Sequence, residues 1–194
     1  MKLLISPHSD DFALFVAFTC MGYKPTILTM YASFLQPSRG FVSCSDNIRV
    51  VEDIRAAHEL GCRIEFAGIP DNLQAPEMEK RTREYLTEFY QGASVEDVWL
   101  PAWEPQGHEH HNLCQRVCQE FFDNETGAKV HHYFTYTRNR GKSRGMVEVI
   151  PGHGSHIAAK LRALACYTSQ LDMTPGIGCW PHFMADLKEY TQPA

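Results

Sequence analysis

The sequence lacks the features of several large classes of protein. In its 194 residues, no apolar run reaches the roughly 18 residues that a membrane-spanning helix needs. Basic residues number 18 against 23 acidic ones, and the net charge of -5 argues against a general nucleic-acid binder. Low-complexity sequence is sparse, and 11% aromatic residues is typical of a folded chain. We therefore expect a globular protein without a membrane span.

The seven cysteines include no Cys-x-x-Cys pair, and their number is odd. This usage is typical of free, mostly buried thiols in a reducing compartment, so we expect a cytoplasmic location. The apolar start of the chain is interrupted by Asp10 and Asp11 before it could form a signal peptide. No repeat or linker divides the sequence, which predicts a single domain over residues 1–194. The oligomeric state is left open.

Segments of strand-like and helix-like length alternate along the chain. Strands are predicted at residues 2–6, 25–31, 63–67, 95–100, 129–137 and 146–150, and helices at 12–21, 46–60, 76–90, 110–122 and 155–169. The tail beyond Leu171 is rich in proline and glycine and is predicted to be irregular. The helix at 46–60 is predicted to be amphipathic, with one face formed by Ile48, Val51, Ile54, Ala57 and His58. Such alternation indicates an α/β fold: a doubly wound, Rossmann-like three-layer α/β/α sandwich with a mostly parallel sheet.

Two loops concentrate the groups that could carry chemistry. The segment Ser6-Pro7-His8-Ser9-Asp10-Asp11-Phe12 follows the first strand, and the loop after the fourth strand holds three histidines within residues 108–111. In the common strand order 3-2-1-4-5, the ligand crevice lies between strands 1 and 4, so these loops should meet. Two histidines and one carboxylate are the protein ligands of hydrolytic zinc sites, which keep a position for water. A second carboxylate could then act as general base.

Each loop also has a simpler interpretation. Asp10 and Asp11 could cap the N-terminus of a helix, where carboxylates are favoured. The histidines of residues 108–111 could belong to a polar loop or to a helix start. Their joint placement after strands 1 and 4 favours a shared site.

Several motifs match one known family in order and spacing. Pro7-His8-Ser9-Asp10-Asp11 and Gly107-His108-Glu109-His110-His111 resemble the "HPDD" and "GHPDH" signatures of the LmbE-like (PIG-L) metal-dependent N-acetylglucosaminyl deacetylases. Further matches with that family, spanning roughly residues 1–171, are Arg49-x-x-Glu52 followed by Gly61, the turn Ile69-Pro70-Asp71, and Lys160-x-x-Ala163-Leu164-x-x-Tyr167-x-Ser169-Gln170.

The resemblance implies hydrolysis of an N-acyl group, usually acetyl, on an amino sugar or a related small molecule. It implies His8, Asp11 and His111 as metal ligands, with zinc as the usual ion and Fe²⁺ as a possible one. It implies Asp10 as the base that activates water. It implies His108 as the protonated partner that stabilises the oxyanion and protonates the leaving amine.

Three residues depart from the family pattern. Ser9 replaces the proline of the first signature, and Phe12 replaces the acidic residue that follows it. His110 replaces the aspartate before the last ligand, which changes the charge balance beside His108. His110 could itself be a weak ligand or a proton carrier.

Other side chains are candidates for binding the substrate. Arg49 could reach the crevice or pair with Glu52 or Asp53, and Trp103 could form a wall against a sugar ring. A basic loop could be a solvated hairpin or a rim that grips an anionic group, and it holds Arg138, Arg140, Lys142 and Arg144.

Two other functions fit the same residues. His8-x-Asp10 with His111 satisfies the two-histidine, one-carboxylate triad of iron(II) oxygenases, although those enzymes usually have double-sheet β folds. Alternatively, the altered acid side could leave a module that binds metal and sugar without turnover.

Overall fold

A mixed sheet forms the middle layer of the computed structural model, which describes residues 1–32, 44–105, 107–135, 147–171 and 188–192. Its strands are β1 (Lys2–Ser6), β2 (Thr26–Tyr31), β3 (Arg63–Ile69), β4 (Asp97–Pro101), β5 (Lys129–Tyr133), β6 (Val147–Val149) and β7 (Glu189–Gln192). The helices are α1 (Asp11–Phe15), α2 (Ala17–Tyr23), α3 (Cys44–Leu60), α4 (Ala75–Tyr90), α5 (Glu109–Glu125), α6 (Gly154–Ala165) and α7 (Thr168–Leu171). No helix of the described ranges is long and apolar enough to cross a membrane.

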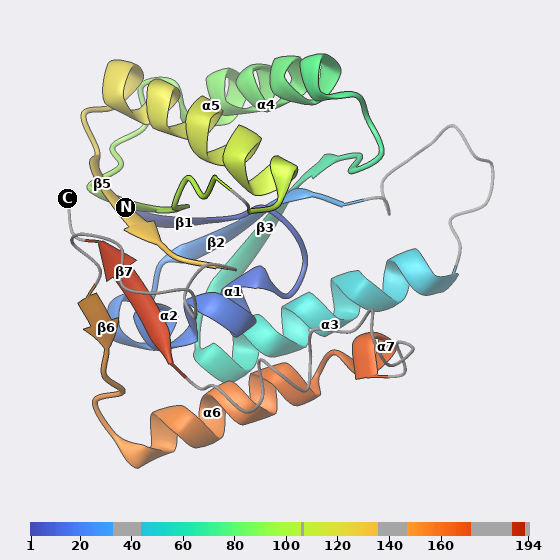
Figure 1. Cartoon of the computed structure of the whole chain (residues 1–194), viewed down its shortest axis with the longest axis vertical. Helices are drawn as coiled ribbons and strands as arrows, with labels where there is room; N and C mark the ends of the chain where they lie inside the picture. The colour runs from blue at the N-terminus through green and yellow to red at the C-terminus, as the bar shows by residue number, and fades with distance from the viewer. Residues whose placement is uncertain (33–43, 106, 136–146, 172–187, 193–194) are drawn as a thin grey trace.

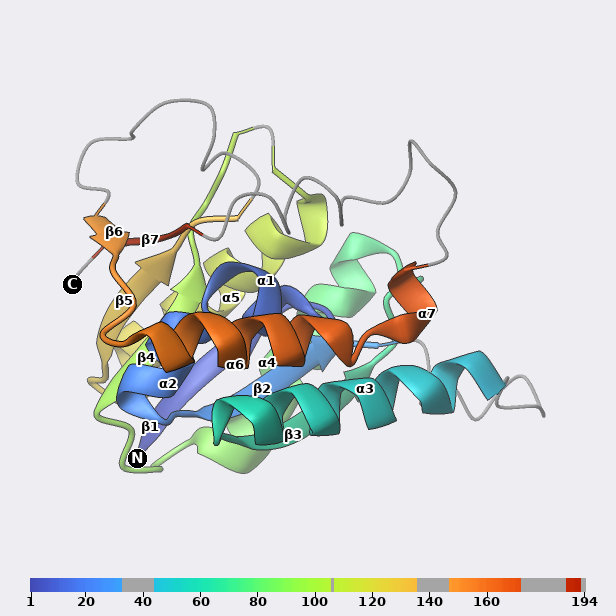
Figure 2. The same cartoon turned by 90° about the horizontal axis from the view of Figure 1, so that it is seen from below.

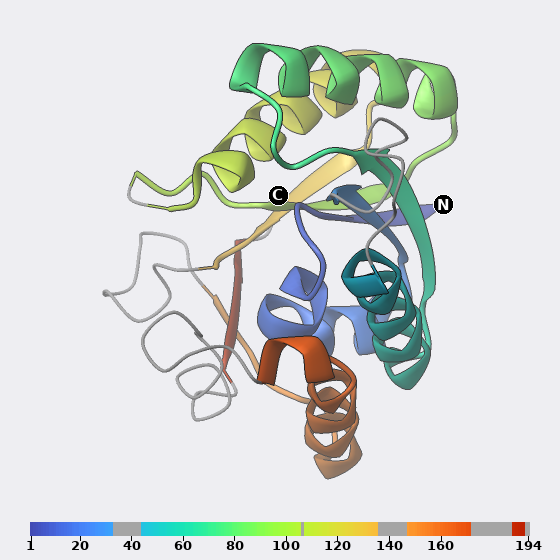
Figure 3. The same ribbon diagram turned by 90° about the vertical axis from the view of Figure 1, so that its right-hand side faces the viewer.

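The strand order places the two candidate loops side by side. In the described part of the chain the order is β3-β2-β1-β4-β5-β7-β6, and β1 pairs in parallel with both β2 and β4. The switch point between β1 and β4 is therefore where the sequence predicted it. Helices α4 and α5 cover one face of the sheet, and α1, α2, α3 and α6 cover the other (Figures 1 and 3). This arrangement confirms the predicted three-layer α/β/α sandwich.

Strand β1 carries the core on both of its faces, as a central parallel strand should. Its residues Leu3, Leu4 and Ile5 are fully buried. Leu4 packs in a cluster with Phe12 of α1, while Leu3 and Ile5 pack on the opposite face of the sheet with α5 residues such as Phe122. The apolar run of β1 thus fixes the edge from which the first candidate loop leaves the sheet.

The two predicted helices at 12–21 and 155–169 are each divided in the structure. The first is interrupted at Val16, whose φ of -146° is not helical, and both oxygens of Glu189 accept the N–H of Phe18 at the start of α2. The second ends at Ala165, and α7 begins at Thr168. Glu189 opens β7, an antiparallel neighbour of both β5 and β6, so the prediction of an irregular tail is wrong for residues 189–192.

The face predicted for the helix at 46–60 is also wrong. Ile48, Val51 and Ile54 are 44–48% exposed. The buried side of α3 instead carries Glu52, Asp53, Ala56, Ala57 and Leu60. Helix α3 runs beside α6 (Figure 2), and its buried carboxylates accept hydrogen bonds from Tyr167 and Ser169, which follow α6.

Candidate metal and catalytic site

Two backbone carbonyls of the loop between β1 and α1 accept hydrogen bonds that fix the loop. Ser6 Oγ donates to the carbonyl of His8 at 2.9 Å, and the N–H of Tyr31 donates to the carbonyl of Pro7 at 2.8 Å. Asp10 precedes α1 with a φ of 77°, in the left-handed region that Asp tolerates better than most residues. Its carbonyl accepts the N–H groups of Ala13 and Leu14, but its side chain makes no cap bond. The carboxylate of Asp10 is therefore available for another role.

The loop between β4 and α5 is fixed by Glu104 and Asn112. The Asn112 side chain accepts the Glu104 N–H and donates to the Glu104 carbonyl, both at 2.8 Å. The buried Glu104 carboxylate accepts the N–H of Thr135 at 2.7 Å. A Cβ on Gly107 would lie 2.8 Å from the Cβ of Glu104, so this turn requires glycine. His108 follows as the N-cap of α5.

Three ligand atoms meet where the two loops touch. His8 Nδ1 and His111 Nε2 lie 3.2 Å apart, and Asp11 Oδ2 lies 3.4 Å from the first and 3.1 Å from the second. A tetrahedral ion with bonds of about 2.0–2.2 Å separates its ligand atoms by about 3.3–3.6 Å. The three side chains therefore fit a divalent ion with only small adjustments.

Burial and charge favour the ligand form of Asp11. Its side chain is 3% exposed, and that of His111 is 2% exposed. Burial alone would raise the pKa of Asp11, but the charges and hydrogen bonds of His111 and His8 hold this pKa well below its usual value. The backbone N–H of His8 also donates to Asp11 Oδ2 at 2.8 Å. Asp11 is thus an ionised carboxylate in a water-poor position, as a metal ligand would be.

Asp10 contacts α3. Arg49 donates to Asp10 Oδ2 at 3.3 Å and to the carbonyl of Ser9 at 3.4 Å. The backbone N–H of Asp10 donates to Asp53 Oδ1 at 3.2 Å. Burial and the Asp11 carboxylate raise the pKa of Asp10 well above its usual value, while Arg49 lowers it. A carboxylate with a raised pKa is suited to accept a proton near neutral pH.

His108 and His110 close the outer side of the site. His108 Nδ1 accepts the backbone N–H of His110 at 3.2 Å, and His110 Nδ1 lies 2.9 Å from His8 Nε2. Burial and the neighbouring histidines lower the pKa of His108 to about 4. The acceptor role of Nδ1 and the lowered pKa both indicate a neutral His108, whereas the resemblance implied a protonated one.

The motif residues outside the loops pair with one another. Ser169 donates to Glu52 through its hydroxyl at 2.6 Å and its N–H at 2.7 Å. The Tyr167 hydroxyl, just before α7, donates to Asp53 Oδ1 at 2.7 Å. The same oxygen accepts the Asp10 N–H, so Asp53 connects Tyr167 to Asp10. Burial raises the pKa of Asp53 to about 6, although the hydrogen bonds from Tyr167 and Asp10 and the charge of Arg49 lower this pKa. The motifs thus build a support beneath Asp10.

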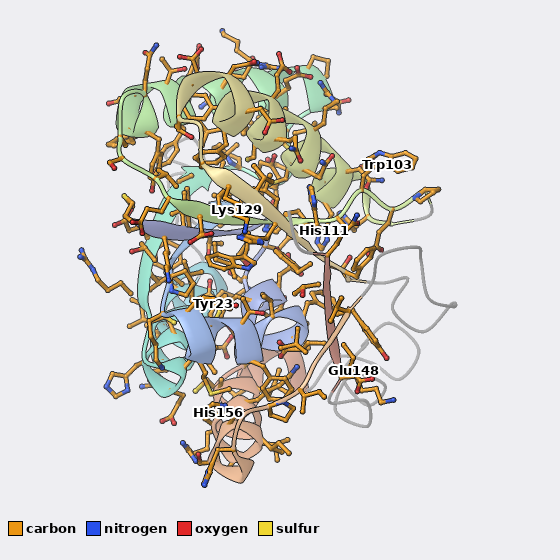
Figure 4. All side chains as sticks on the ribbon, turned by 90° about the vertical axis from the view of Figure 1, so that its left-hand side faces the viewer. Tyr23, Trp103, His111, Lys129, Glu148 and His156 are labelled. Carbon is orange, nitrogen blue, oxygen red and sulfur yellow. The ribbon has the colours of Figure 1, made fainter. Side chains whose placement is uncertain are left out.

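The remaining predicted residues are placed unequally. Trp103 is 58% exposed on the loop before α5, at the rim of the molecule, while His111 lies further in (Figure 4). Arg49 reaches Asp10, rather than pairing with Glu52 or Asp53. Arg140 and Arg144 lie outside the described residues.

Sequence reasoning missed Asp53, Glu104 and Asn112 as parts of the site. Asp53 appeared only as a possible partner of Arg49. The spacing of Asp53 from Ala56, Ala57 and Leu60 places all four on one face of α3, and this was the sequence signal that could have found Asp53. For Glu104 and Asn112 the sequence offered no signal beyond their place in the loop.

No protein-family model matches the sequence, and no curated protein matches it. Solved structures do match. The A40926 pseudoaglycone deacetylase Dbv21 has a TM-score of 0.77 at 18% identity, over 99% of this chain and 96% of its own. The N,N'-diacetylchitobiose deacetylase from Pyrococcus horikoshii has a TM-score of 0.67 at 20% identity, over 94% and 74%. GalB, the 4-carboxy-2-hydroxymuconate hydratase from Pseudomonas putida KT2440, has a TM-score of 0.69 at 19% identity, over 95% and 84%.

These likenesses concern the fold, because the identities are low. They show that this chain shares the fold of two deacetylases, which agrees with the fold that the motifs indicated. The same architecture also carries a hydratase, so the reaction has to be argued from the residues of the site.

Proposed function

We propose that this protein is a metal-dependent amide hydrolase that removes an N-acyl group, most simply acetyl, from an amino sugar or a related small molecule. The proposal depends on one observation. Two imidazole nitrogens and one carboxylate oxygen form a triangle with edges of 3.1–3.4 Å, and the residue before its aspartate, Asp10, carries a second carboxylate that is not part of it. The two deacetylases of the same fold support the choice of substrate class.

His8, Asp11 and His111 would hold the divalent ion. When bound, such an ion polarises an acyl carbonyl and acidifies water. One carboxylate and two imidazoles suit zinc, and Fe²⁺ fits the same set. The buried pair Asp11 and His111 excludes competing solvent from one side of the triangle.

Asp10 would be the general base. Its carboxylate would accept the proton of the water that attacks the acyl carbon, while Arg49, 3.3 Å from Oδ2, keeps the carboxylate oriented. The bond from the Asp10 N–H to Asp53 holds the strained backbone of this residue in place. Once protonated, Asp10 can return the proton to the departing nitrogen.

His108 would stabilise the developing oxyanion as a neutral donor. Its Nδ1 accepts a helix N–H and therefore carries no proton, which places the ring proton on Nε2. That N–H can donate to the oxyanion without an imidazolium. Arg49 and Trp103 would contact the substrate at the rim, and we retain His110, Arg140 and Arg144 as candidates for the same role.

The direct test is acetate release from a panel of N-acetyl amino sugars that includes N-acetylglucosamine and N,N'-diacetylchitobiose. We expect release that stops after chelation and returns with Zn²⁺. Asp10→Asn should lower the rate by roughly 10²–10⁴-fold with metal content unchanged. Asp123→Asn, an exposed aspartate of α5 far from the loops, is the matched control and should retain the rate.

The other outcomes distinguish the alternatives. Sugar and metal binding without acetate release would indicate a binding module. Addition of water to an unsaturated acid, again without acetate release, would indicate the hydratase chemistry known for this fold. The iron(II) oxygenase is not favoured, because those enzymes usually have double-sheet β folds and this chain has a three-layer α/β/α fold. The cytoplasmic location and the single domain stay predictions.

A further inference from the structure

His8 has two ring nitrogens that face two different groups of side chains. Its Nδ1 faces Asp11 and His111 in the ligand triangle. Its Nε2 faces away from that triangle and lies 2.9 Å from Nδ1 of His110. The proposed function uses only the first nitrogen. The second one, together with His110, is available for further chemistry.

His108 completes a second group around this nitrogen. Ligand atoms of His8, His108 and His110 all lie within 4.8 Å of one another. The three ring centroids are 4.8–5.2 Å apart. The backbone arranges this group: His108 and His110 stand on either side of the first residue of α5, and the His110 N–H donates to His108 Nδ1.

We propose that His8, His108 and His110 form a second divalent-cation site, which shares His8 with the first site. An all-imidazole ligand set suits zinc, copper or nickel and does not suit magnesium or calcium, which prefer oxygen. The His108 side of the group is exposed, so an ion can enter from solvent without opening the fold.

The geometry requires a small change when the ion binds. At 2.9 Å, His8 Nε2 and His110 Nδ1 share one proton in a hydrogen bond. A tetrahedral zinc ion with bonds of about 2.0–2.1 Å holds its nitrogen ligands about 3.3–3.4 Å apart. The two rings would therefore move apart by a few tenths of an ångström, and the shared proton would leave to solvent. His108 would bind through Nε2, whose proton moves to Nδ1 in place of the bond from the His110 N–H. With both sites filled, His8 would bind through both ring nitrogens, which requires its imidazolate form.

The packing around the rings supports this role. Tyr31 packs against the rings of both His8 and His110, which limits their freedom to turn. The second site thus has three ligands and a packed floor.

A count of bound zinc tests the proposal without any substrate. Protein stripped by a chelator is dialysed against rising free Zn²⁺, and elemental analysis gives the zinc bound per chain. We expect a first equivalent at low zinc and a second at higher zinc. His110→Asn should remove only the second step, and His111→Ala should remove the first.

Two further variants keep the test decisive. His108→Asn removes the imidazole but retains a side chain favoured at a helix N-cap, so α5 should still form while the second step is lost. His58→Ala removes an exposed histidine of α3, far from the site, and should retain both steps. A single zinc step in the unmodified protein, or a second step that survives in both His110→Asn and His108→Asn, would overturn the proposal.

The zinc count is independent of the proposed reaction. If acetate release is absent but both zinc steps appear, the proposed function fails and the second site stands. If acetate release is found and only one step appears, the second site fails alone. If acetate release and both zinc steps are found, the second ion would bind His108, so excess zinc should inhibit acetate release. His110→Asn should abolish that inhibition.

Discussion

Replacing Lys160 by methionine should destabilise the fold far more than loss of an ordinary ion pair. Lys160 Nζ lies 2.6 Å from Glu189 Oε1, and the two side chains are 1% and 0% exposed. The same ammonium donates to the carbonyl of Leu14 at 3.0 Å, and Glu189 accepts the N–H of Phe18. This pair therefore ties α6, β7 and the α1–α2 region together.

The magnitude follows from the burial of the pair. Methionine fills a similar volume but leaves the Glu189 carboxylate as an uncompensated buried charge, which costs about 3–5 kcal/mol. In a protein of this length 1 kcal/mol lowers Tm by about 2–4 °C, so the fall should be about 6–20 °C. The double variant Lys160→Met with Glu189→Gln removes both charges and keeps an acceptor for Phe18. It should lose less stability than the sum of the single variants.

Thermal and urea unfolding measure these values. Lys80→Met is the matched control, because Lys80 and Glu84 form a pair at 3.9 Å with both side chains more than 60% exposed. It should cost at most about 0.5 kcal/mol. The reasoning would be refuted if Lys160→Met cost no more than this control. Zinc bound by the folded Lys160→Met protein should be unchanged, because the pair does not touch the ligand triangle.

Three further predictions concern the site. Asp11→Asn should lower metal content, because it removes the charged ligand, whereas Asp10→Asn should retain it; reversed results in elemental analysis would exchange their roles. Gly107→Ala should reduce turnover through displacement of the β4–α5 turn, and Gly22→Ala, where nothing lies within 4 Å of the added Cβ, should not. Because burial raises the pKa of Asp53 to about 6, the native state binds more protons than the unfolded chain between about pH 4 and 6. The free energy of unfolding should therefore gain a component that falls as pH rises through this window, and urea unfolding of Asp53→Asn should lack it.

The fold could be predicted from the sequence because its signals are local. Each central strand is a short apolar run followed by a helix, and this alternation determines a parallel sheet and its switch point. Strand β7 carries no such signal. It is four residues long, and it joins the sheet through antiparallel pairing with β5 and β6 and through the contacts of Glu189. The sequence of a short segment does not show which distant strands it pairs with, so β7 could not be predicted.

The candidate ligands could be located for a similar reason. His8 and Asp11 follow β1 directly, and His111 follows β4 after one turn, so the parallel sheet alone brings them to the same edge. The ring orientation of His8 could not be predicted in this way. Which nitrogen faces Asp11 depends on the backbone of residues 6–11 and on the packing of Tyr31, and only three-dimensional contacts reveal that the other nitrogen faces His110.

Helix α3 shows why an apolar pattern can mislead near a functional site. Its exposed face carries Ile48, Val51 and Ile54, while Glu52 and Asp53 lie on the buried side. Burial of these carboxylates is tolerable since Ser169, Tyr167 and the Asp10 N–H donate to them. Each of those donors lies far away in sequence. A hydrophobicity pattern assigns carboxylates to solvent, and the assignment fails here because the helix supports the loop that carries Asp10 as well as a core.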